Sequence, residues 1–248
     1  MPITQITAFL GFGDPFVRRI EMKCTALIVC GAAASLALAH GEDADYGLAI
    51  IDGSVAVGLG DHDTGTITEF GERVFAAEMA LSGSNWFADE PGIFIAENSL
   101  ADNTQVSFTL TSALLYWDGT GSVNFSQAAH AMNLTFGPAS VSTAFNNNPV
   151  AGFSINYDAD QAGGFDEHFD YTVDAAAGNG IFVLANSFSL SGASDSEVIF
   201  TVFNAGLEED LHEEAIEYVE HVLVPAPGAM GVLAIAGLGM VSRRRRVS

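Results

Sequence analysis

Short runs of alternating apolar and polar residues, separated by turns that contain glycine, fill the middle of the chain. Alternation with a period of two predicts a strand that has one face buried and the other in solvent. We expect strands at residues 46–51, 54–59, 64–70, 73–80, 106–117, 132–136, 153–157, 169–173, 181–190 and 198–203. Asp52-Gly53 joins the first two and is the strongest short signal for a β-hairpin. Residues 86–92, by contrast, are expected to form a loop.

Many short strands with turns at regular spacing predict a mainly β body, namely an antiparallel β-sandwich or jelly roll. A parallel α/β sheet would need helices between the strands, and the pattern shows none there. The sequence also lacks the internal repeats that would indicate a solenoid or a propeller. Residues 40–224 are therefore expected to form one β domain of ordinary size.

The pattern changes to a helical period near the carboxyl end. Residues 207–223 place their apolar side chains on one stripe. Acidic residues at 208–210 occupy the first turn, where the helix dipole favours negative charge. Pro225 ends this segment. We expect one C-terminal amphipathic helix that packs on the sandwich.

An apolar segment at residues 26–38 follows Met22 and a lysine and closes on Ala-Leu-Ala. A basic start, a short apolar run and small residues at its end are typical of a secretory signal peptide. We expect translation to begin at Met22, which makes residues 1–21 a non-native extension and residues 22–39 the signal peptide. The alternative is a long amino-terminal region of the signal, because two arginines at positions 18 and 19 also precede the apolar run.

Such a signal would send the body through the Sec export machinery, with cleavage by signal peptidase after Ala39. Both cysteines, Cys24 and Cys30, lie inside the signal. The mature body is therefore expected to contain neither a disulfide nor a thiol nucleophile.

The charge of the body is one-sided. Residues 40–224 contain 29 Asp and Glu, one arginine (Arg73) and no lysine. A surface of this kind repels the phosphate backbone, so nucleic acid is excluded as a partner. The lack of lysine excludes Schiff-base chemistry and a P-loop. Neither G-x-S-x-G nor H-E-x-x-H occurs, and we predict no catalytic residues.

An apolar run at residues 226–241 follows Pro225, and a cluster of four basic residues comes next. These four are Arg243, Arg244, Arg245 and Arg246. The run spans roughly 24 Å as a helix, which is short for a hydrocarbon core about 30 Å thick. The arginines can reach the headgroups and are expected to stay on the cytoplasmic side. The pattern predicts a short hydrophobic tail helix in the membrane, with a basic stop.

This end of the chain resembles the PEP-CTERM sorting signal, in which a short proline motif, a helix rich in small residues and an arginine cluster follow one another. The match covers about residues 224–246. The motif here is Pro225, Ala226, Pro227 and Gly228, whereas the usual tripeptide of the family is Pro-Glu-Pro. Tails of this kind are also labelled ice-binding protein C-terminal domain, a name that describes the sorting tail and not an ice-binding face.

The resemblance implies an exported protein of a Gram-negative bacterium that carries an exosortase-type membrane processing enzyme. This enzyme would recognise the tail, residues 225–248, and cut near Pro227. The protein would then be membrane-anchored before processing and lie at the cell surface or outside the cell afterwards.

Two patterns offer ligands for a metal ion. Asp166, His168 and Asp170 fall on one face of a predicted strand, and imidazole with carboxylates can hold a divalent metal. Asp61 and Asp63 flank a histidine in a glycine-containing turn, which suggests a loose Ca²⁺ site. Ordinary outward-facing polar residues and a polar turn explain the same patterns. The acidic residues at 42–45 are expected to be a solvated start of the body.

The leading hypothesis is a non-enzymatic cell-surface or extracellular-matrix protein, with exopolysaccharide as a candidate partner. The alternative is a secreted carbohydrate-binding or carbohydrate-active domain that uses a carboxylate pair or an aromatic face. The residues that would supply this face, unless they pack in the core, are Trp86, Phe87, Tyr116 and Trp117. A second alternative is a calcium-dependent adhesive module. Two adjacent buried carboxylates in one cleft would favour the carbohydrate-active hypothesis.

Overall fold

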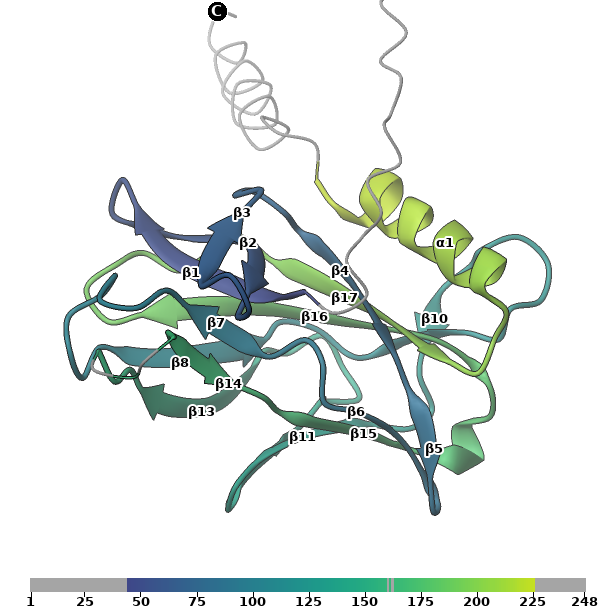
Figure 1. Ribbon diagram of the computed structural model, residues 1–248. Coiled ribbons are helices and arrows are strands. Elements are labelled where there is room, and N and C mark those ends of the chain that lie inside the picture. The colour runs from purple at the N-terminus through teal and green to yellow at the C-terminus, as the bar shows by residue number, and fades with distance from the viewer. Residues whose placement is uncertain (1–43, 160, 162, 226–248) are drawn as a thin grey trace, which may run out of the picture. The chain divides into compact units, whose positions relative to one another are not determined.

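A computed structural model of the chain describes residues 44–159, 161 and 163–225 (Figure 1). The expected extension, the expected signal peptide and the tail beyond Pro225 lie outside these residues. So do Ala226, Pro227 and Gly228 of the sorting motif, and the arginines at 243–246. Within the described ranges, no helix is both long and apolar enough to cross a membrane.

Strands are the dominant regular structure, which confirms the predicted mainly β class. The strands are β1 Asp45–Ile51, β2 Ser54–Asp61, β3 Thr66–Thr68, β4 Val74–Glu78, β5 Ala80–Ser82, β6 Asn85–Ala88, β7 Ile93–Ile95, β8 Gln105–Leu110, β9 Leu115–Trp117, β10 Ser126–Gln127, β11 Met132–Phe136, β12 Ala139–Ser142, β13 Val150–Asn156, β14 Phe165–Glu167, β15 Asp170–Asp174, β16 Gly180–Leu190 and β17 Ile199–Ala205. The helical elements are η1 Ala175–Ala177, α1 Glu209–Tyr218 and the π-helical turn η2 Val219–Leu223.

The strands form three sheets. Sheet A has the order β14-β7-β1-β2-β3, and sheet C has the order β12-β11-β15-β6-β5. Sheet B has the order β10-β9-β16-β17-β4, with β8 also on β16 and β13 on β8. All strand pairs among these residues are antiparallel except β1–β7 and β4–β17, which are parallel. Parallel neighbours need long connections, and several strands lie between the two members of each pair.

The first predicted hairpin is confirmed. β1 and β2 pair along their full length, from Asp45 opposite Gly60 to Ile51 opposite Ser54. Asp52 and Gly53 connect them with φ angles of 52° and 80°. Two positive φ angles in a two-residue loop match the twist of the flanking strands, which explains why the sequence uses Asp-Gly here.

Two strands that the sequence predicts as continuous are broken in the structure. The predicted strand at 73–80 splits at Met79, so that β4 belongs to sheet B and β5 to sheet C. The predicted strand at 106–117 splits after Leu110, because the chain leaves the ladder of β16 and rejoins it at Leu115. Apolar residues continue across both breaks, since Met79 at the first and Ala113 and Leu114 at the second are themselves buried.

The predicted loop at 86–92 is wrong in its first part. Trp86 and Phe87 lie in β6, where they pair with Val173 and Thr172 of β15. Aromatic residues fit a pleated, half-buried surface well, and this preference outweighs the short length of the strand. The loop proper begins only after Ala88.

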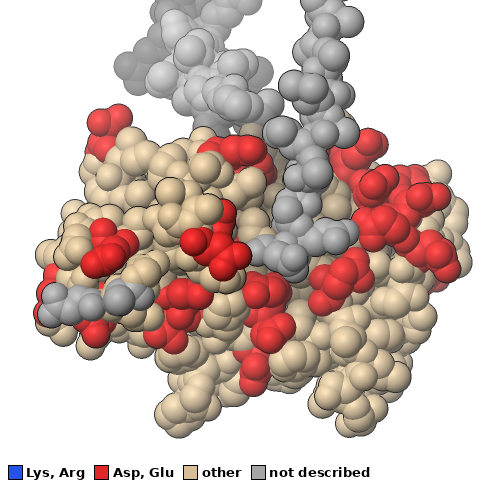
Figure 2. All heavy atoms as spheres, viewed as in Figure 1, with Lys and Arg blue, Asp and Glu red and all other residues tan. Residues whose placement is uncertain are grey.

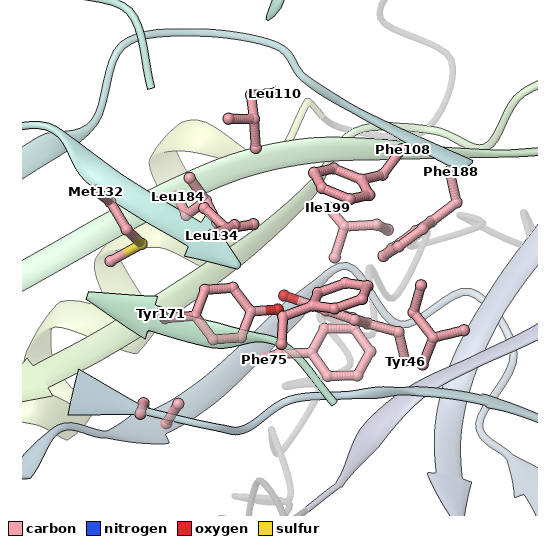
Figure 3. Packing of buried hydrophobic residues seen from close by; sticks show 14 of the residues in the cluster. Tyr46, Phe75, Phe108, Leu110, Met132, Leu134, Tyr171, Leu184, Phe188 and Ile199 are labelled. Carbon is pink, nitrogen blue, oxygen red and sulfur yellow. The ribbon is translucent and has the colours of Figure 1, made fainter. Parts of the chain in front are cut away.

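The main core lies where the three sheets meet. Figure 3 shows Tyr46 of β1, Phe75 of β4 and Phe188 of β16 packed together. The ring centroid of Tyr46 lies 4.8 Å from that of Phe75 and 4.9 Å from that of Phe188. In the same core cluster, the ring centroid of Tyr171 of sheet C lies 5.1 Å from that of Phe203 of β17. Burial of large aromatic side chains from all three sheets is what joins them into one body.

A second apolar cluster lies between sheet B and α1. Ala215, Ile216 and Val219 contact a cluster that includes Val74 of β4 and Val202 of β17. The predicted helix therefore packs on the sandwich as expected, on the far side of sheet B from the main core (Figure 1). The α-helical part ends at Tyr218, and a π-helical turn completes the predicted segment.

Candidate functional site

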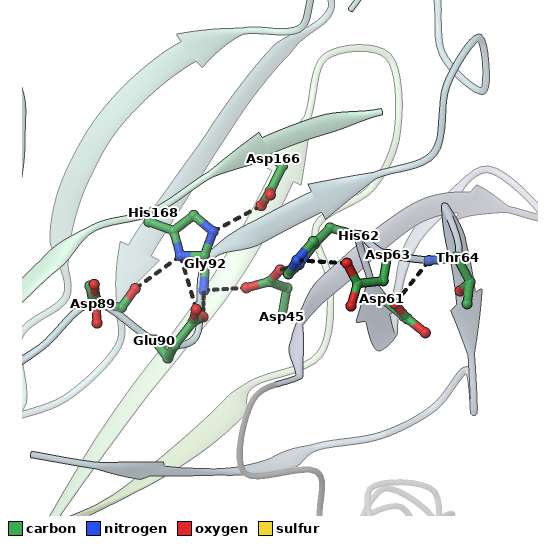
Figure 4. A network of polar contacts seen from close by, with 10 residues as sticks. All are labelled: Asp45, Asp61, His62, Asp63, Thr64, Asp89, Glu90, Gly92, Asp166 and His168. Carbon is green, nitrogen blue, oxygen red and sulfur yellow. Dashed lines mark hydrogen bonds and ion pairs between the residues drawn. The ribbon is translucent and has the colours of Figure 1, made fainter. Parts of the chain in front are cut away.

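A cluster of four titratable side chains lies where three distant segments of the chain meet (Figure 4). Asp45 opens β1, Glu90 lies in the loop before β7, and Asp166 and His168 lie in and just after β14. We call these four residues the carboxylate–histidine cluster. The side chain of Asp45 is only 1% exposed, so this position is a buried one and not the solvated start that the sequence predicts.

The backbone of Gly92 holds the buried carboxyl group of Asp45 and the partly exposed carboxyl group of Glu90 in place. Its N–H donates to Asp45 Oδ1 at 2.7 Å and also lies 3.1 Å from Glu90 Oε2. A Cβ atom at this position would lie 2.9 Å from Asp45 Oδ1 and 3.0 Å from the carbonyl oxygen of Glu167. Only glycine leaves room for the two carboxyl groups to converge on this amide.

Asp45 and Glu90 are hydrogen-bonded to each other, which requires a proton between them. Burial raises the pKa of Asp45 above its usual value. Burial, together with the hydrogen bond and the charge of Asp45, raises the pKa of Glu90 to about 7. The pair therefore holds one proton near neutral pH and behaves as a single titrating unit.

His168 connects this pair to Asp166. Its Nδ1 lies 3.2 Å from both Glu90 Oε1 and the carbonyl oxygen of Asp89, and its Nε2 lies 3.0 Å from Asp166 Oδ1. Burial acts to lower the pKa of His168, but the negative charges of Glu90, Asp45 and Asp166 outweigh it and the pKa is raised. The contact between Nε2 and Asp166 is not aligned as a hydrogen bond, because Oδ1 is buried without a hydrogen-bond partner.

The turn with the predicted Ca²⁺ ligands lies beside this cluster. Asp61 Oδ1 accepts a hydrogen bond from the N–H of Thr64 at 3.1 Å, and this bond lowers the pKa of the exposed Asp61 carboxyl. Asp63 Oδ1 lies 3.5 Å from Nε2 of His62, whose Nδ1 lies 3.9 Å from Asp45 Oδ2. Asp61 thus closes the β2–β3 turn, and the histidine between the two predicted ligands is the residue that reaches the cluster.

The structure brings together two of the five predicted metal ligands. Asp166 and His168 have ligand atoms within 4.8 Å of each other and of a carboxylate oxygen of Asp45. Asp170 is not part of this group: it opens β15 in sheet C, where it is exposed and lies opposite Thr135. The chain changes from sheet A to sheet C between Glu167 and Asp170, so the single strand face assumed in the sequence does not exist.

The sequence missed Asp45 and Glu90. No local signal marks either residue, because their burial depends on β1 pairing with β7, which lies some 45 positions further along the chain. The Glu90-Pro91 peptide bond directly before Gly92 is cis. Only a long-range pairing rule could have found the cluster.

The cluster can share protons or hold a cation. Asp45, Asp166 and His168 offer oxygen and nitrogen ligands of the kind that divalent metals bind. It is not arranged as a glycosidase pair, because such carboxyls stand about 5 Å or more apart to admit the substrate, whereas Asp45 and Glu90 bond each other.

The aromatic residues considered for a sugar-binding face do not form one. Trp86 is buried in the main core and donates its Nε1–H to the carbonyl of Gly178. Trp117 is buried in the separate cluster under α1. Core packing therefore explains the two largest of these side chains.

Comparisons with known proteins give no family. No protein-family model matches the chain, and no curated protein matches it. Among solved structures, the chain is similar to the CooA pilin subunit from enterotoxigenic Escherichia coli, with 8% sequence identity and a TM-score of 0.28. That match covers 55% of this chain and 92% of the pilin chain, and at this TM-score it carries no argument about fold or function.

Proposed function

We propose that this chain is an exported cell-surface or extracellular-matrix protein that acts by binding and by its physical presence, and not by catalysis. The observation that carries this proposal is the unbalanced charge of the folded body. Arg73 is the one Lys or Arg in residues 44–225, against 29 acidic residues in the expected mature body at 40–224.

This one cationic side chain is held by the fold. Arg73 donates from Nε and a terminal nitrogen to the carbonyl oxygen of Val198, at 3.0 and 2.8 Å, and pairs with Glu197 at 3.1 Å. Its side chain is only 16% exposed. Figure 2 shows acidic groups spread across the visible face, with no Lys or Arg among the described residues seen there.

An acidic shell of this kind has a clear physical consequence. It repels copies of the same protein and polyanions, and it attracts cations from solution. The partner that fits best is an extracellular polysaccharide, either neutral or bridged by divalent cations. The calcium-dependent adhesive module remains a narrower version of this proposal.

The localisation in this proposal rests on the resemblance of the carboxyl end to a PEP-CTERM signal. A sorting tail needs no chemistry from the body. Signal peptidase would act at the amino end and an exosortase-type enzyme at the tail.

Deletion of residues 225–248 tests whether the tail determines the localisation of the protein. In the producing cell, the full chain is expected in the membrane and surface fractions, and the truncated chain in the medium, since its anchor is gone. A chain that lacks only the last two residues keeps the arginine cluster and serves as the control. Intact mass of each mature product fixes both processing sites. Retention of the truncated chain in the membrane fraction would contradict the proposal.

The carbohydrate-active alternative is tested at Asp45 and Glu90, whose carboxyls are adjacent although they do not have the spacing of a glycosidase pair. Purified full chain is incubated with polysaccharides and the release of reducing ends is measured. Our proposal expects none. Release that Glu90→Gln abolishes and that the exposed control Glu97→Gln leaves intact would establish an enzyme instead.

A further inference from the structure

A second cluster of ligand-type side chains lies at the junction of α1 and β4, apart from the carboxylate–histidine cluster. Glu209 and His212 are three positions apart on α1, which places them on one face of the helix. Glu78 is the last residue of β4. One ligand atom of each residue lies within 4.8 Å of the other two.

His212 is the unusual member of this group. It is 1% exposed, and its Nε2 lies 3.0 Å from the carbonyl oxygen of Val202. A carbonyl oxygen only accepts hydrogen bonds, so the proton must be on Nε2. The other ring nitrogen, Nδ1, is buried and has no hydrogen-bond partner, although Glu78 Oε1 lies only 2.9 Å away.

Neither protonation state of Nδ1 suits this geometry. Without a proton, Nδ1 lies 2.9 Å from a carboxylate oxygen with no hydrogen between them, and the two electron-rich atoms repel each other. With a proton, the ring is a buried cation whose N–H is not directed along a hydrogen bond to that oxygen. A buried histidine side chain is normally better satisfied than either state allows.

A metal ion between the two atoms resolves the conflict. Ligand atoms about 2.1 Å from a common ion are roughly 3.0 Å apart at a right angle and roughly 3.4 Å apart at a tetrahedral angle. The distance of 2.9 Å between Nδ1 and Glu78 Oε1 is close to the lower value. Two ligand atoms of one ion each point at the ion and not at each other, so Nδ1 and Glu78 Oε1 can lie close together without a hydrogen bond between them.

The groups around the cluster are those that orient metal ligands. The hydrogen bond from Nε2–H to a backbone carbonyl fixes the tautomer in which Nδ1 is free to bind a metal. Asn204 Nδ2 donates to Glu78 Oε1 at 3.0 Å and holds that carboxylate in place. Glu78 and Glu209 are exposed, so an ion can enter from solvent and keep water as a further ligand.

We propose that His212, Glu78 and Glu209 form a binding site for a divalent transition-metal ion of the Zn²⁺ class. One imidazole and two carboxylates suit such an ion, whereas Ca²⁺ takes oxygen ligands. The site would tie α1 to the edge strand of sheet B. It is independent of the route by which the protein is exported and of its extracellular partner.

The test is titration of the purified full chain, freed of metal by a chelator, with Zn²⁺ in a calorimeter. Glu209→Gln and Glu78→Gln each remove one ligand charge, and the glutamine at position 78 can still accept the bond from Asn204. Each variant is expected to weaken Zn²⁺ binding by at least about tenfold. Glu213→Gln removes the same charge from the exposed face of the same helix and should leave binding unchanged.

A second control separates the two clusters. Asp166→Asn alters the carboxylate–histidine cluster and should not change the binding assigned to α1. Co²⁺ in place of Zn²⁺ is expected to give visible absorption that Glu209→Gln reduces. Ca²⁺ at equal concentration should not displace Zn²⁺.

Three results would overturn the proposal. The absence of Zn²⁺ binding would mean that a protonated His212 paired with Glu78 is the whole explanation. Equal affinities for Glu209→Gln and Glu213→Gln, or loss of binding with Asp166→Asn alone, would place the ion elsewhere. Displacement of Zn²⁺ by equimolar Ca²⁺ would refute the metal class.

Discussion

At the scale of single residues, polar groups buried among the aromatic side chains carry much of the specificity of this fold. The hydroxyl groups of Tyr46 and Thr201 are hydrogen-bonded to each other, and both residues are at most 1% exposed. Tyr171 donates its hydroxyl to the carbonyl oxygen of Pro91 at 2.8 Å. Sequence patterns place these tyrosines in the core, but they do not show which groups satisfy the hydroxyls.

Tyr46→Phe is expected to lower the free energy of unfolding by about 1–3 kcal/mol, because it leaves the buried hydroxyl of Thr201 without its partner. Urea denaturation measures the change. Tyr116→Phe is the matched control, since its hydroxyl bonds the carbonyl of Asn179 in an exposed position and should cost less. Equal costs for the two variants would contradict this account of the core.

The proton shared by Asp45 and Glu90 predicts a pH dependence of stability. The pKa of Glu90 is raised from its ordinary value of 4.5 to about 7. In this interval the folded protein binds the proton more tightly than the unfolded chain, so the free energy of unfolding falls as pH rises. The raised pKa of His168 acts in the same direction.

Between about pH 4.5 and pH 7, this contribution is on the order of 1 kcal/mol, because partial exposure of Glu90 reduces the full effect of the shift. Glu90→Gln is expected to reduce the decrease in the free energy of unfolding over this pH range. Denaturation at a series of pH values measures it, with Glu97→Gln as the exposed control. If both variants keep the slope of the original chain, the shared proton does not contribute to stability.

At the scale of elements, α1 is stabilised by its contacts more than by its own sequence. Glu208, at its amino-terminal cap, makes no side-chain capping bond. The helix instead buries Ala215 and Ile216 against sheet B, and the π-helical turn that follows it buries Val219. The helical period in the sequence was enough to predict this element and its buried stripe, since one apolar face needs one partner surface.

Ile216→Ala is expected to lower the free energy of unfolding by about 2–4 kcal/mol, because it leaves a cavity between α1 and sheet B. Glu217→Ala, on the exposed face of the same turn, should change it by less than about 0.5 kcal/mol. Thermal and urea denaturation give both values. A cost below about 1 kcal/mol for Ile216→Ala would show that the helix is only loosely attached.

At the scale of the whole molecule, charge repulsion opposes folding. The full chain carries a formal net charge of −23, and the sequence isoelectric point is about 4.2. Salt shortens the range of this repulsion, from about 30 Å at 0.01 M to about 8 Å at 0.15 M. The folded state, which brings the charges closest together, benefits most from the screening.

Raising NaCl from about 0.01 M to about 0.15 M at neutral pH is therefore expected to raise Tm by roughly 2–4 °C, equivalent to about 1 kcal/mol. The same change near pH 4.2, where the net charge is close to zero, should have little effect. Calorimetry or spectroscopic melting measures both. A salt effect of equal size at the two pH values would show that repulsion is not its cause.

The sequence alone determined the β class, the first hairpin, the helix and the acidic character of the body. These features depend on local periodicity, turn chemistry and composition, which are properties of neighbouring residues. Only the tertiary structure decided where strands change sheets and which polar side chains meet. Asp45 and Glu90, or Glu78 and His212, come together through strand pairs and helix packing between residues far apart in the chain. Short-range patterns contain no information about such contacts, because many long-range pairings satisfy the same alternation.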